Sequence, residues 1–358
     1  MNSETGHPGY HFETGIYRPP SEGGSYSLLI RTTRNCPWNQ CTFCSMYKGE
    51  KFSFRSPEEI KGDIDAIAAL GEDLSRLSQE LGYKGEINRA VIIELINRVP
   101  SLDTSHGFVM VLNWLQSGGR TAFLQDANSP AMGTENLIEV LKYLRSKFPS
   151  LKRVTSYGRS KTLARKSAEE LRAIHEAGLD RLHVGLESGD DALLKEVKKG
   201  VTSQEHIDGG RKAMEAGFQL SEYWMPGLGG RAHWEAHARN TARTLNAINP
   251  HYIRSRPFYP APGTPIFEAC ERGDFQSLTG EGQLRELQVM IEELEVTSKV
   301  CFDHAGNYWR NRRGGLLFTQ DYEGYRFPEE KPKVLDLIRE GIEAQKITPR
   351  SRENAFNF

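Results

Sequence analysis

The chain has 358 residues, enough for one large domain with additions or for two ordinary domains. Hydrophobic residues make up 38% of it and there are 34 glycines, a composition that excludes wholesale disorder. The 46 lysine and arginine residues nearly balance the 47 aspartate and glutamate residues. The net charge of −1 lacks the basic excess of a nucleic-acid-binding protein, so we expect no nucleic-acid partner.

We expect no segment for membrane insertion or export. The longest apolar run, Phe108 to Leu112, is far shorter than a spanning helix or the apolar part of a signal peptide, and the first ten residues are polar. We therefore expect a cytoplasmic protein with no membrane partner.

From about residue 25, short apolar segments alternate with helical ones. Six segments rich in aliphatic and aromatic residues are predicted to be strands: Tyr26–Thr33, Thr121–Gln125, Arg153–Tyr157, Arg181–Leu186, Gln219–Met225 and Tyr252–Phe258. Strands that alternate with helices imply right-handed crossovers and a parallel sheet. The fold class is α/β, either an open doubly wound sheet or a curved, incompletely closed barrel.

The helices between these strands have clear start signals. Capping boxes are predicted at Ser56–Glu59, Ser167–Glu170 and Thr202–Glu205. Isoleucine and leucine then recur every three or four residues from Ile60 to Leu81, which predicts one long amphipathic helix.

Two shorter helices are predicted at Arg89–Val99 and Gly107–Ser117, so residues 57–120 form a helical elaboration after the first strand. We divide the chain into an N-terminal extension (1–24), a core (25–268) and a mostly helical C-terminal tail (269–358). Helices are predicted in the tail near Gly280–Val300 and Pro332–Gln345.

Three of the five cysteines, Cys36, Cys41 and Cys44, lie within nine residues just past the first predicted strand. In a reducing compartment such a cluster indicates a metal-binding or catalytic site. A structural zinc site or an ordinary electron-transfer cluster would need a fourth ligand, and the local sequence offers only three. One coordination position is therefore left open, as a catalytic metal requires.

The loop of three cysteines, with Phe43 just before the last of them and a series of βα units around it, resembles the radical S-adenosylmethionine (radical SAM) superfamily. The spacing here is four and then two intervening residues, where that superfamily usually has three and then two. The resemblance extends over about residues 25–268. Leu182–Asp190, Lys198–Gly200 and Tyr223–Gly230 are similar to the branch with anaerobic coproporphyrinogen oxidases and tRNA methylthiotransferases.

The resemblance implies a partial (β/α)6 barrel with a four-iron four-sulfur (4Fe-4S) cluster and S-adenosylmethionine as cofactors. Cys36, Cys41 and Cys44 would bind the cluster. The residues implied for the nucleoside and methionine parts of S-adenosylmethionine are Phe43, Asp126, Asn128, Ser156, Arg159, Glu187 and Met225. Each has a simpler interpretation as a turn, exposed or packing residue.

The tail contains Cys301 and Tyr308 in a dense set of polar and redox-capable residues. These two are our candidates for contact with substrate, with Cys301 as a hydrogen-atom donor. The alternative for Cys301 is a buried, inert thiol.

The implied activity is reductive cleavage of S-adenosylmethionine to a 5′-deoxyadenosyl radical, which abstracts hydrogen from a small-molecule substrate. An electron donor such as flavodoxin or ferredoxin would be a partner. The alternatives are a non-catalytic iron–sulfur or zinc protein, an interaction module, and an RNA- or peptide-modifying radical SAM enzyme. The last would require further cysteines, and only Cys270 and Cys301 remain.

Overall fold

The computed structural model describes residues 10–15 and 27–347, which form two compact units. The first unit contains the described residues up to 35 together with 52–157 and 173–180. The second contains residues 36–51, 158–172 and the described residues from 181 onward. Most of the predicted extension 1–24 and the first residue of the strand predicted from Tyr26 lie outside the described residues.

The first unit has a parallel sheet in which β4 (Thr121–Gln125) pairs with β1 (Leu28–Arg31) and with β5 (Arg153–Gly158). In the register, Phe123 aligns with Leu29 on one side and with Thr155 on the other. The carboxyl ends of β1 and β4 therefore lie together. A separate antiparallel pair forms from β2 (Thr33–Arg34) and β3 (Ser53–Phe54).

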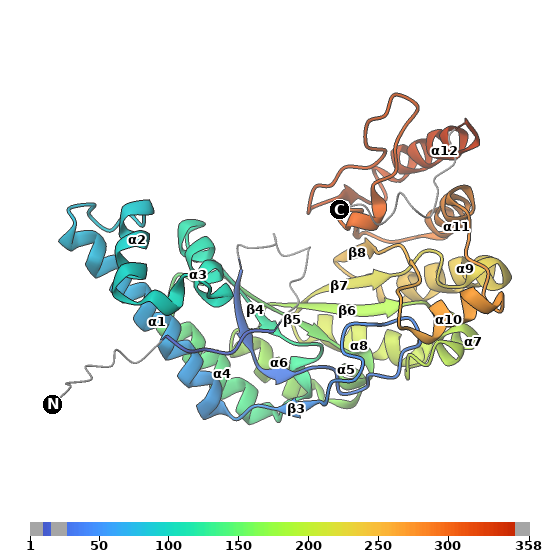
Figure 1. Ribbon diagram of the computed structural model, residues 1–358. Coiled ribbons are helices and arrows are strands. Elements are labelled where there is room, and N and C mark those ends of the chain that lie inside the picture. The colour runs from blue at the N-terminus through green and yellow to red at the C-terminus, as the bar shows by residue number, and fades with distance from the viewer. Residues whose placement is uncertain (1–9, 16–26, 348–358) are drawn as a thin grey trace. The chain divides into compact units, whose positions relative to one another are not determined.

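Helix α1 (Pro57–Glu80) begins at the predicted capping box, where Ser56 and Glu59 bond each other's backbone N–H groups. Its isoleucines and leucines from Ile60 to Leu77 are buried, whereas Leu81 is exposed just past the end of the helix. Helix α1 packs against α4 (Figure 1). The remaining helical elements of this unit are α2 (Arg89–Arg98), the 3-10 turn η3 (Pro100–Leu102), α3 (His106–Gln116), the 3-10 turn η4 (Ser129–Ala131) and α4 (Thr134–Lys147).

In its described residues, the second unit has four strands in parallel succession followed by one antiparallel strand. Their order is β6 (Arg181–Glu187), β7 (Gln219–Trp224), β8 (Tyr252–Ser255), β9 (Lys299–Cys301) and β10 (Tyr325–Arg326). Strand β9 is parallel to β8, and β10 is antiparallel to β9.

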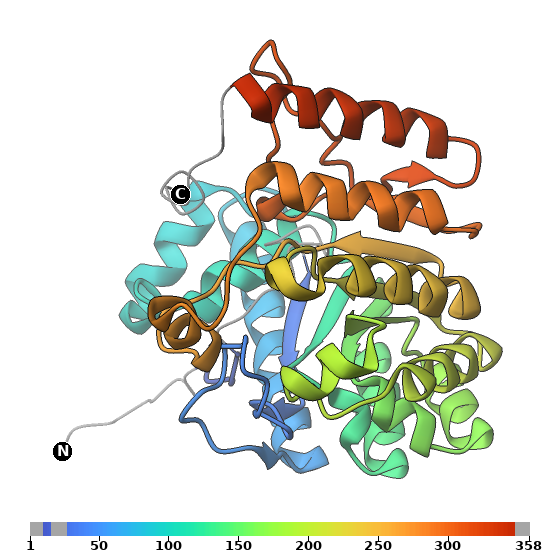
Figure 2. The same ribbon diagram turned by 90° about the vertical axis from the view of Figure 1, so that its right-hand side faces the viewer.

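The helices of the second unit carry the other start signals. Thr202 and Glu205 form a capping box, and Ser167 and Glu170 exchange the same pair of bonds. Helices α9, α11 and α12 lie side by side, as the gold, orange and red helices of Figure 2 show. The bounds are α5 (Ser160–Arg165), α7 (Asp191–Glu196), α8 (Ser203–Glu215), α9 (Gly230–Ile248), α10 (Pro265–Arg272), α11 (Gly280–Glu293), η5 (Ala305–Asn307) and α12 (Lys331–Ile347), with α6 (Ala168–Glu176) after α5.

The tail differs from the sequence prediction in one respect. The helix predicted near Gly280–Val300 ends at Glu293, and the chain then extends into β9. Val296, Thr297 and Val300 are β-branched residues, which favour an extended backbone over a helix. The tail therefore adds two strands to the sheet as well as helices.

The mostly parallel strands confirm the predicted α/β class, and the strand order of the described residues does not close on itself. Within residues 10–15 and 27–347, no helix combines the length and the apolar character needed to cross a bilayer.

Candidate functional site

The loop with the three cysteines belongs to the second unit, where backbone bonds fix its middle. The Thr42 N–H donates to the Val197 carbonyl at 3.0 Å, and the Thr42 carbonyl accepts from the Ile266 N–H at 3.2 Å. The loop segment between Cys41 and Phe43 is therefore attached on one side to the residue after α7 and on the other to the start of α10.

Phe43 anchors the same segment through its side chain. It packs against a buried apolar cluster made of Leu193, Val197, Met225, Leu228, Phe258 and Ile266. Two predicted site residues, Phe43 and Met225, thus meet in one cluster, which holds the cysteine loop against the loop after β7.

The three cysteines are free thiols of intermediate burial. The Asn39 N–H donates to Cys36 Sγ at 3.4 Å, and the Cys44 N–H donates to the Cys41 carbonyl at 3.4 Å. In the part of the chain that the structure describes, no three His, Cys, Asp or Glu side chains are grouped so that they could hold a metal ion. In a 4Fe-4S cluster each cysteine binds a different iron, so its three sulfur ligands do not need to share one metal ion.

The donor set nevertheless fits an iron–sulfur cluster, because thiolates are its usual protein ligands and three of them share one short loop. Burial raises the pKa of the Cys41 thiol, and the positive charges of Lys199 and Arg159 act in the opposite direction. These two cations therefore favour the thiolate form that binds iron.

Lys199 connects the cysteine loop with the end of β6. Its Nζ lies 2.9 Å from Glu187 Oε1 and 6.0 Å from the centre of the Phe43 ring. Its backbone carbonyl accepts a hydrogen bond from Arg159 Nη2 at 2.8 Å. Glu187, Phe43 and Arg159, all predicted as site residues, therefore surround one lysine.

Trp38 in the cysteine loop contacts the same turn. Its indole N–H donates to the Lys198 carbonyl at 2.7 Å, and the Arg159 guanidinium lies over its ring at 5.2 Å from the centroid. Gly200 has a φ of +72°, and a Cβ there would overlap the Trp38 ring. The turn needs glycine for its left-handed backbone and for this close approach.

Glu187 ends β6 in an unusual backbone conformation. The pairing of β6 with β7 shifts register between Gly185 and Glu187, and Glu187 has a φ of +63°. Its Oε2 atom is buried, and no hydrogen-bond partner for it exists among the described residues. Left-handed backbone at a non-glycine residue and an unpaired buried oxygen are both typical of binding sites.

Glu222, in the middle of β7, is a site candidate that our sequence reasoning missed. It is completely buried, and neither carboxylate oxygen has a hydrogen-bond partner among the described residues. Burial raises its pKa well above the ordinary value, although the charge of Lys199 acts against this. Burial therefore favours the neutral carboxylic acid form of this side chain.

The other predicted cofactor residues lie in the first unit. Asp126, just past β4, is buried, and its Oδ2 accepts from Arg31 Nη2 at 2.8 Å and from the Asn35 N–H at 2.7 Å. Burial raises the pKa of Asp126, and these two donors partly counteract that shift. Asn128 is buried before η4, and Ser156 is buried on β5 with its hydroxyl donating to the Tyr157 carbonyl at 2.9 Å.

The two tail candidates are in different surroundings. Cys301 on β9 is completely buried, and burial raises its pKa to about 12. Its Sγ lies 3.5 Å from the Tyr322 carbonyl, to which it donates. Tyr308 is 37% exposed. The environment of Cys301 matches the inert-thiol alternative that the sequence left open.

Comparison with known families assigns one segment of the chain to a family. Residues 154–238 match the family model of the Radical SAM superfamily. The chain carries a radical SAM domain. This radical SAM segment belongs to an enzyme superfamily and includes Arg159, Glu187, Lys199 and Met225, whereas the three cysteines precede it.

Several solved structures are similar to this chain at low identity. Elp3 of Methanocaldococcus infernus is 14% identical with a TM-score of 0.45, over 67% of this chain and 58% of that one. The methyltransferase TsrM of Kitasatospora setae is 17% identical with a TM-score of 0.47, over 74% and 44%. The coproporphyrinogen III oxidase HemN of Escherichia coli is 15% identical with a TM-score of 0.44, over 74% and 51%. No curated protein sequence matches the chain.

Proposed function

We propose that this chain is a radical SAM enzyme that binds a 4Fe-4S cluster through Cys36, Cys41 and Cys44. The observation that supports this most is the matched segment itself, because its Lys199 and Arg159 provide the positive charge beside Cys41. When bound, such a cluster supplies one electron to the carbon–sulfur bond of S-adenosylmethionine, and a 5′-deoxyadenosyl radical and methionine result.

The residues of the second unit have separable roles in this proposal. Lys199 and Arg159 stabilise the thiolate form of Cys41. Phe43 and Met225 exclude water from the base of the loop through their shared apolar cluster. Glu187 offers Oε2, a buried acceptor without a partner in the described residues, to a ribose hydroxyl or to the methionine amino group.

The residues of the first unit are assigned from the resemblance. Asp126, or in second place Asn128, is proposed to accept from the methionine amino group, and Ser156 to bind the methionine carboxylate. In the structure Asp126 Oδ2 is bonded to Arg31 and Asn35, and Oδ1 lies close to Gly15. Tyr308 stays a proposed substrate contact.

The substrate in this proposal is a small molecule from which the radical removes a hydrogen atom. The identity of this substrate determines the reaction subclass and whether S-adenosylmethionine is consumed or regenerated. The electron comes from a carrier such as flavodoxin or ferredoxin, because the reaction consumes one electron for each radical formed.

The test is anaerobic reconstitution with iron and sulfide, followed by addition of S-adenosylmethionine and dithionite. We expect about four irons per chain, a cluster absorption band, and formation of 5′-deoxyadenosine. The variants C36A, C41A and C44A should each lose the cluster and the product. C270A is the matched control, since Cys270 is also a partly buried cysteine of the second unit and lies outside the loop.

The competing zinc or electron-transfer function makes the opposite prediction. A protein of that kind would retain its metal in C44A and would form no 5′-deoxyadenosine with any reductant. Either result would refute the proposed function.

A further inference from the structure

The segment Tyr10–Gly15 lies against the first unit and is fixed there at several points. The Tyr10 hydroxyl donates to Asp73 on α1. Gly15 and Gln125 at the end of β4 bond each other twice, at 2.8 and 3.2 Å. The Phe12 ring lies so close to Gly107 that a Cβ there would be 2.8 Å away. The segment therefore crosses the carboxyl end of β4.

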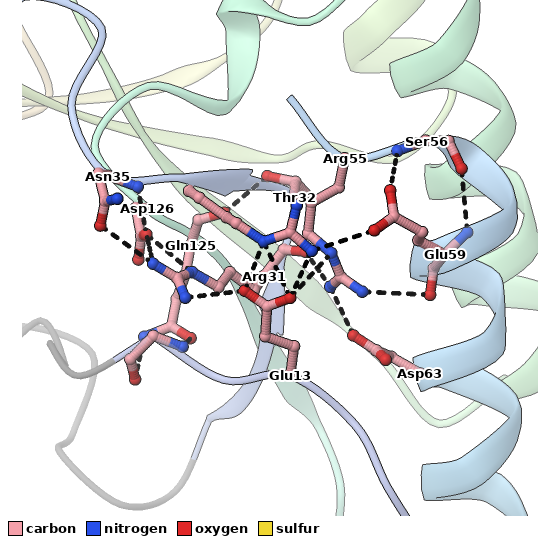
Figure 3. A network of polar contacts seen from close by, with 12 residues as sticks. Glu13, Arg31, Thr32, Asn35, Arg55, Ser56, Glu59, Asp63, Gln125 and Asp126 are labelled. Carbon is pink, nitrogen blue, oxygen red and sulfur yellow. Dashed lines mark hydrogen bonds and ion pairs between the residues drawn. The ribbon is translucent and has the colours of Figure 1, made fainter. Parts of the chain in front are cut away.

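Glu13 in this segment places its carboxylate among three arginines. Figure 3 labels two of them, Arg31 and Arg55. Arg31 Nη1 lies 2.8 Å from Oε1, and Arg34 lies 2.8 Å from Oε1 through Nε and 2.7 Å from Oε2 through Nη2. Arg55 Nε lies 3.5 Å from Oε2. Burial alone would raise the pKa of Glu13, but the three guanidinium groups outweigh it and lower the pKa.

Each of the three arginines also has an acid of its own in the fold. Arg31 pairs with Asp126 at 2.8 Å, Arg34 with Glu59 at 3.0 Å, and Arg55 with Asp63 at 2.5 Å. These acids lie after β4 and on α1, which are fixed parts of the unit. The arginines are thus held in place independently of Glu13, and their remaining N–H groups converge on the point that its carboxylate occupies.

A carboxylate has too few acceptor oxygens for the N–H groups that the three arginines present. The Arg55 side chain is only 4% exposed, and its buried Nε makes no hydrogen bond among the described residues. Glu13 has two oxygens, which serve Arg31 and Arg34. A buried donor without an acceptor destabilises the folded state. A third acceptor oxygen at this position would remove that destabilisation.

We propose that Arg31, Arg34 and Arg55 form a binding site for the phosphate group of a small-molecule phosphomonoester, and that Glu13 occupies this site when the ligand is absent. A phosphate monoester presents three terminal oxygens and nearly two negative charges, and planar guanidinium groups match its geometry. Binding requires Glu13 to leave, so the segment Tyr10–Gly15 acts as an internal competitor. This site does not depend on the proposed cluster chemistry, and the two fail separately.

The test measures binding of inorganic phosphate and of methyl phosphate by calorimetry at constant ionic strength, without cluster or S-adenosylmethionine. In E13Q the neutral amide competes less well, so we expect both phosphates to bind about tenfold more tightly than to the wild type. Adding R55Q or R34Q to E13Q should abolish the gain. Two arginine variants are included because either one alone could impair folding, which circular dichroism would reveal.

The control variants remove equivalent charges elsewhere in the first unit. Glu139 pairs with Lys61, and Arg98 pairs with Glu94, both at exposed positions. E139Q and R98Q should leave phosphate binding unchanged. Equal affinity of E13Q and wild type for phosphate would overturn the proposal, and so would a gain that persists in the double variants. If acetate bound to E13Q as tightly as phosphate, a third oxygen would not be needed. If methyl phosphate did not bind to E13Q, the ligand could not be a phosphomonoester.

Discussion

The ammonium group of Lys199 lies 2.9 Å from Glu187 Oε1, and both side chains are almost entirely buried, at 13% and 10% exposure. The second carboxylate oxygen of Glu187 has no hydrogen-bond partner among the described residues. Lys199 therefore provides the main compensation for a buried negative charge beside the cysteine loop.

Replacement of Lys199 by methionine should destabilise the protein by about 3 kcal/mol, because it leaves the Glu187 carboxylate buried and uncompensated. Urea unfolding of the protein without cluster measures this. The double variant E187Q/K199M should recover at least half of the loss, since the neutral amide needs no counter-charge. K195M, at an exposed position on α7, is the control. A double variant as unstable as K199M would contradict the role assigned to the ion pair.

Gly200→Ala tests the contact between the Lys198–Gly200 turn and Trp38. An alanine at a φ of +72° costs about 1–2 kcal/mol, and its methyl group would also displace the indole ring. Gly263 has a φ of +77° with no atom near its missing Cβ, so G263A measures the backbone cost alone. We expect G200A to lose more stability than G263A and to change the tryptophan fluorescence. Equal losses in both variants would show that the Trp38 contact is unimportant.

Much of the fold follows from local sequence signals. The capping box at Ser56 and the periodic apolar residues of α1 are local features, and the structure confirms both. Strand β9 has only three residues, and its identity depends on pairing with β8, which is remote in sequence. A prediction from short windows therefore extended the preceding helix across it.

The candidate site also has features that the sequence predicts and features that only the folded chain reveals. The cysteine spacing was visible because the three residues are close in the chain. The roles of Lys199 and Glu222 depend on burial and on charges from other elements, which the sequence does not display. The three arginines around Glu13 are 18 to 42 residues from it in the chain, so only the folded unit reveals that they converge.

Cys301 should be the least reactive of the five cysteines. It is completely buried, and its pKa of about 12 leaves almost no thiolate at pH 8. Iodoacetamide added to the reduced protein without cluster should label Cys36, Cys41, Cys44 and Cys270 and spare Cys301 until urea is added. Peptide mass spectrometry measures the labelling of each cysteine. Labelling of Cys301 at the rate of Cys270 in the folded protein would contradict its burial and reopen a chemical role for it.

Acid should destabilise the protein through His237. Its ring is buried on α9, with Nδ1 2.8 Å from Ser188 Oγ and Nε2 3.0 Å from the Met225 carbonyl. Burial lowers its pKa to about 4 from an ordinary value near 6.5. Below pH 6.5 the His237 ring binds a proton in the unfolded chain, whereas in the folded chain it does so only near pH 4. The free energy of unfolding therefore decreases as the pH falls through this range.

The expected slope from His237 is about 1.4 kcal/mol per pH unit, the value for one proton bound only by the unfolded state. Urea unfolding at several pH values between 4.5 and 7.5 measures it. In H237Q this part of the slope should vanish, because glutamine keeps a polar side chain but does not titrate. His233 lies on the same helix with an exposed side chain, and H233Q should leave the slope unchanged. His206 is also buried with a lowered pKa, so a residual slope in H237Q is expected, and only an undiminished one contradicts the prediction.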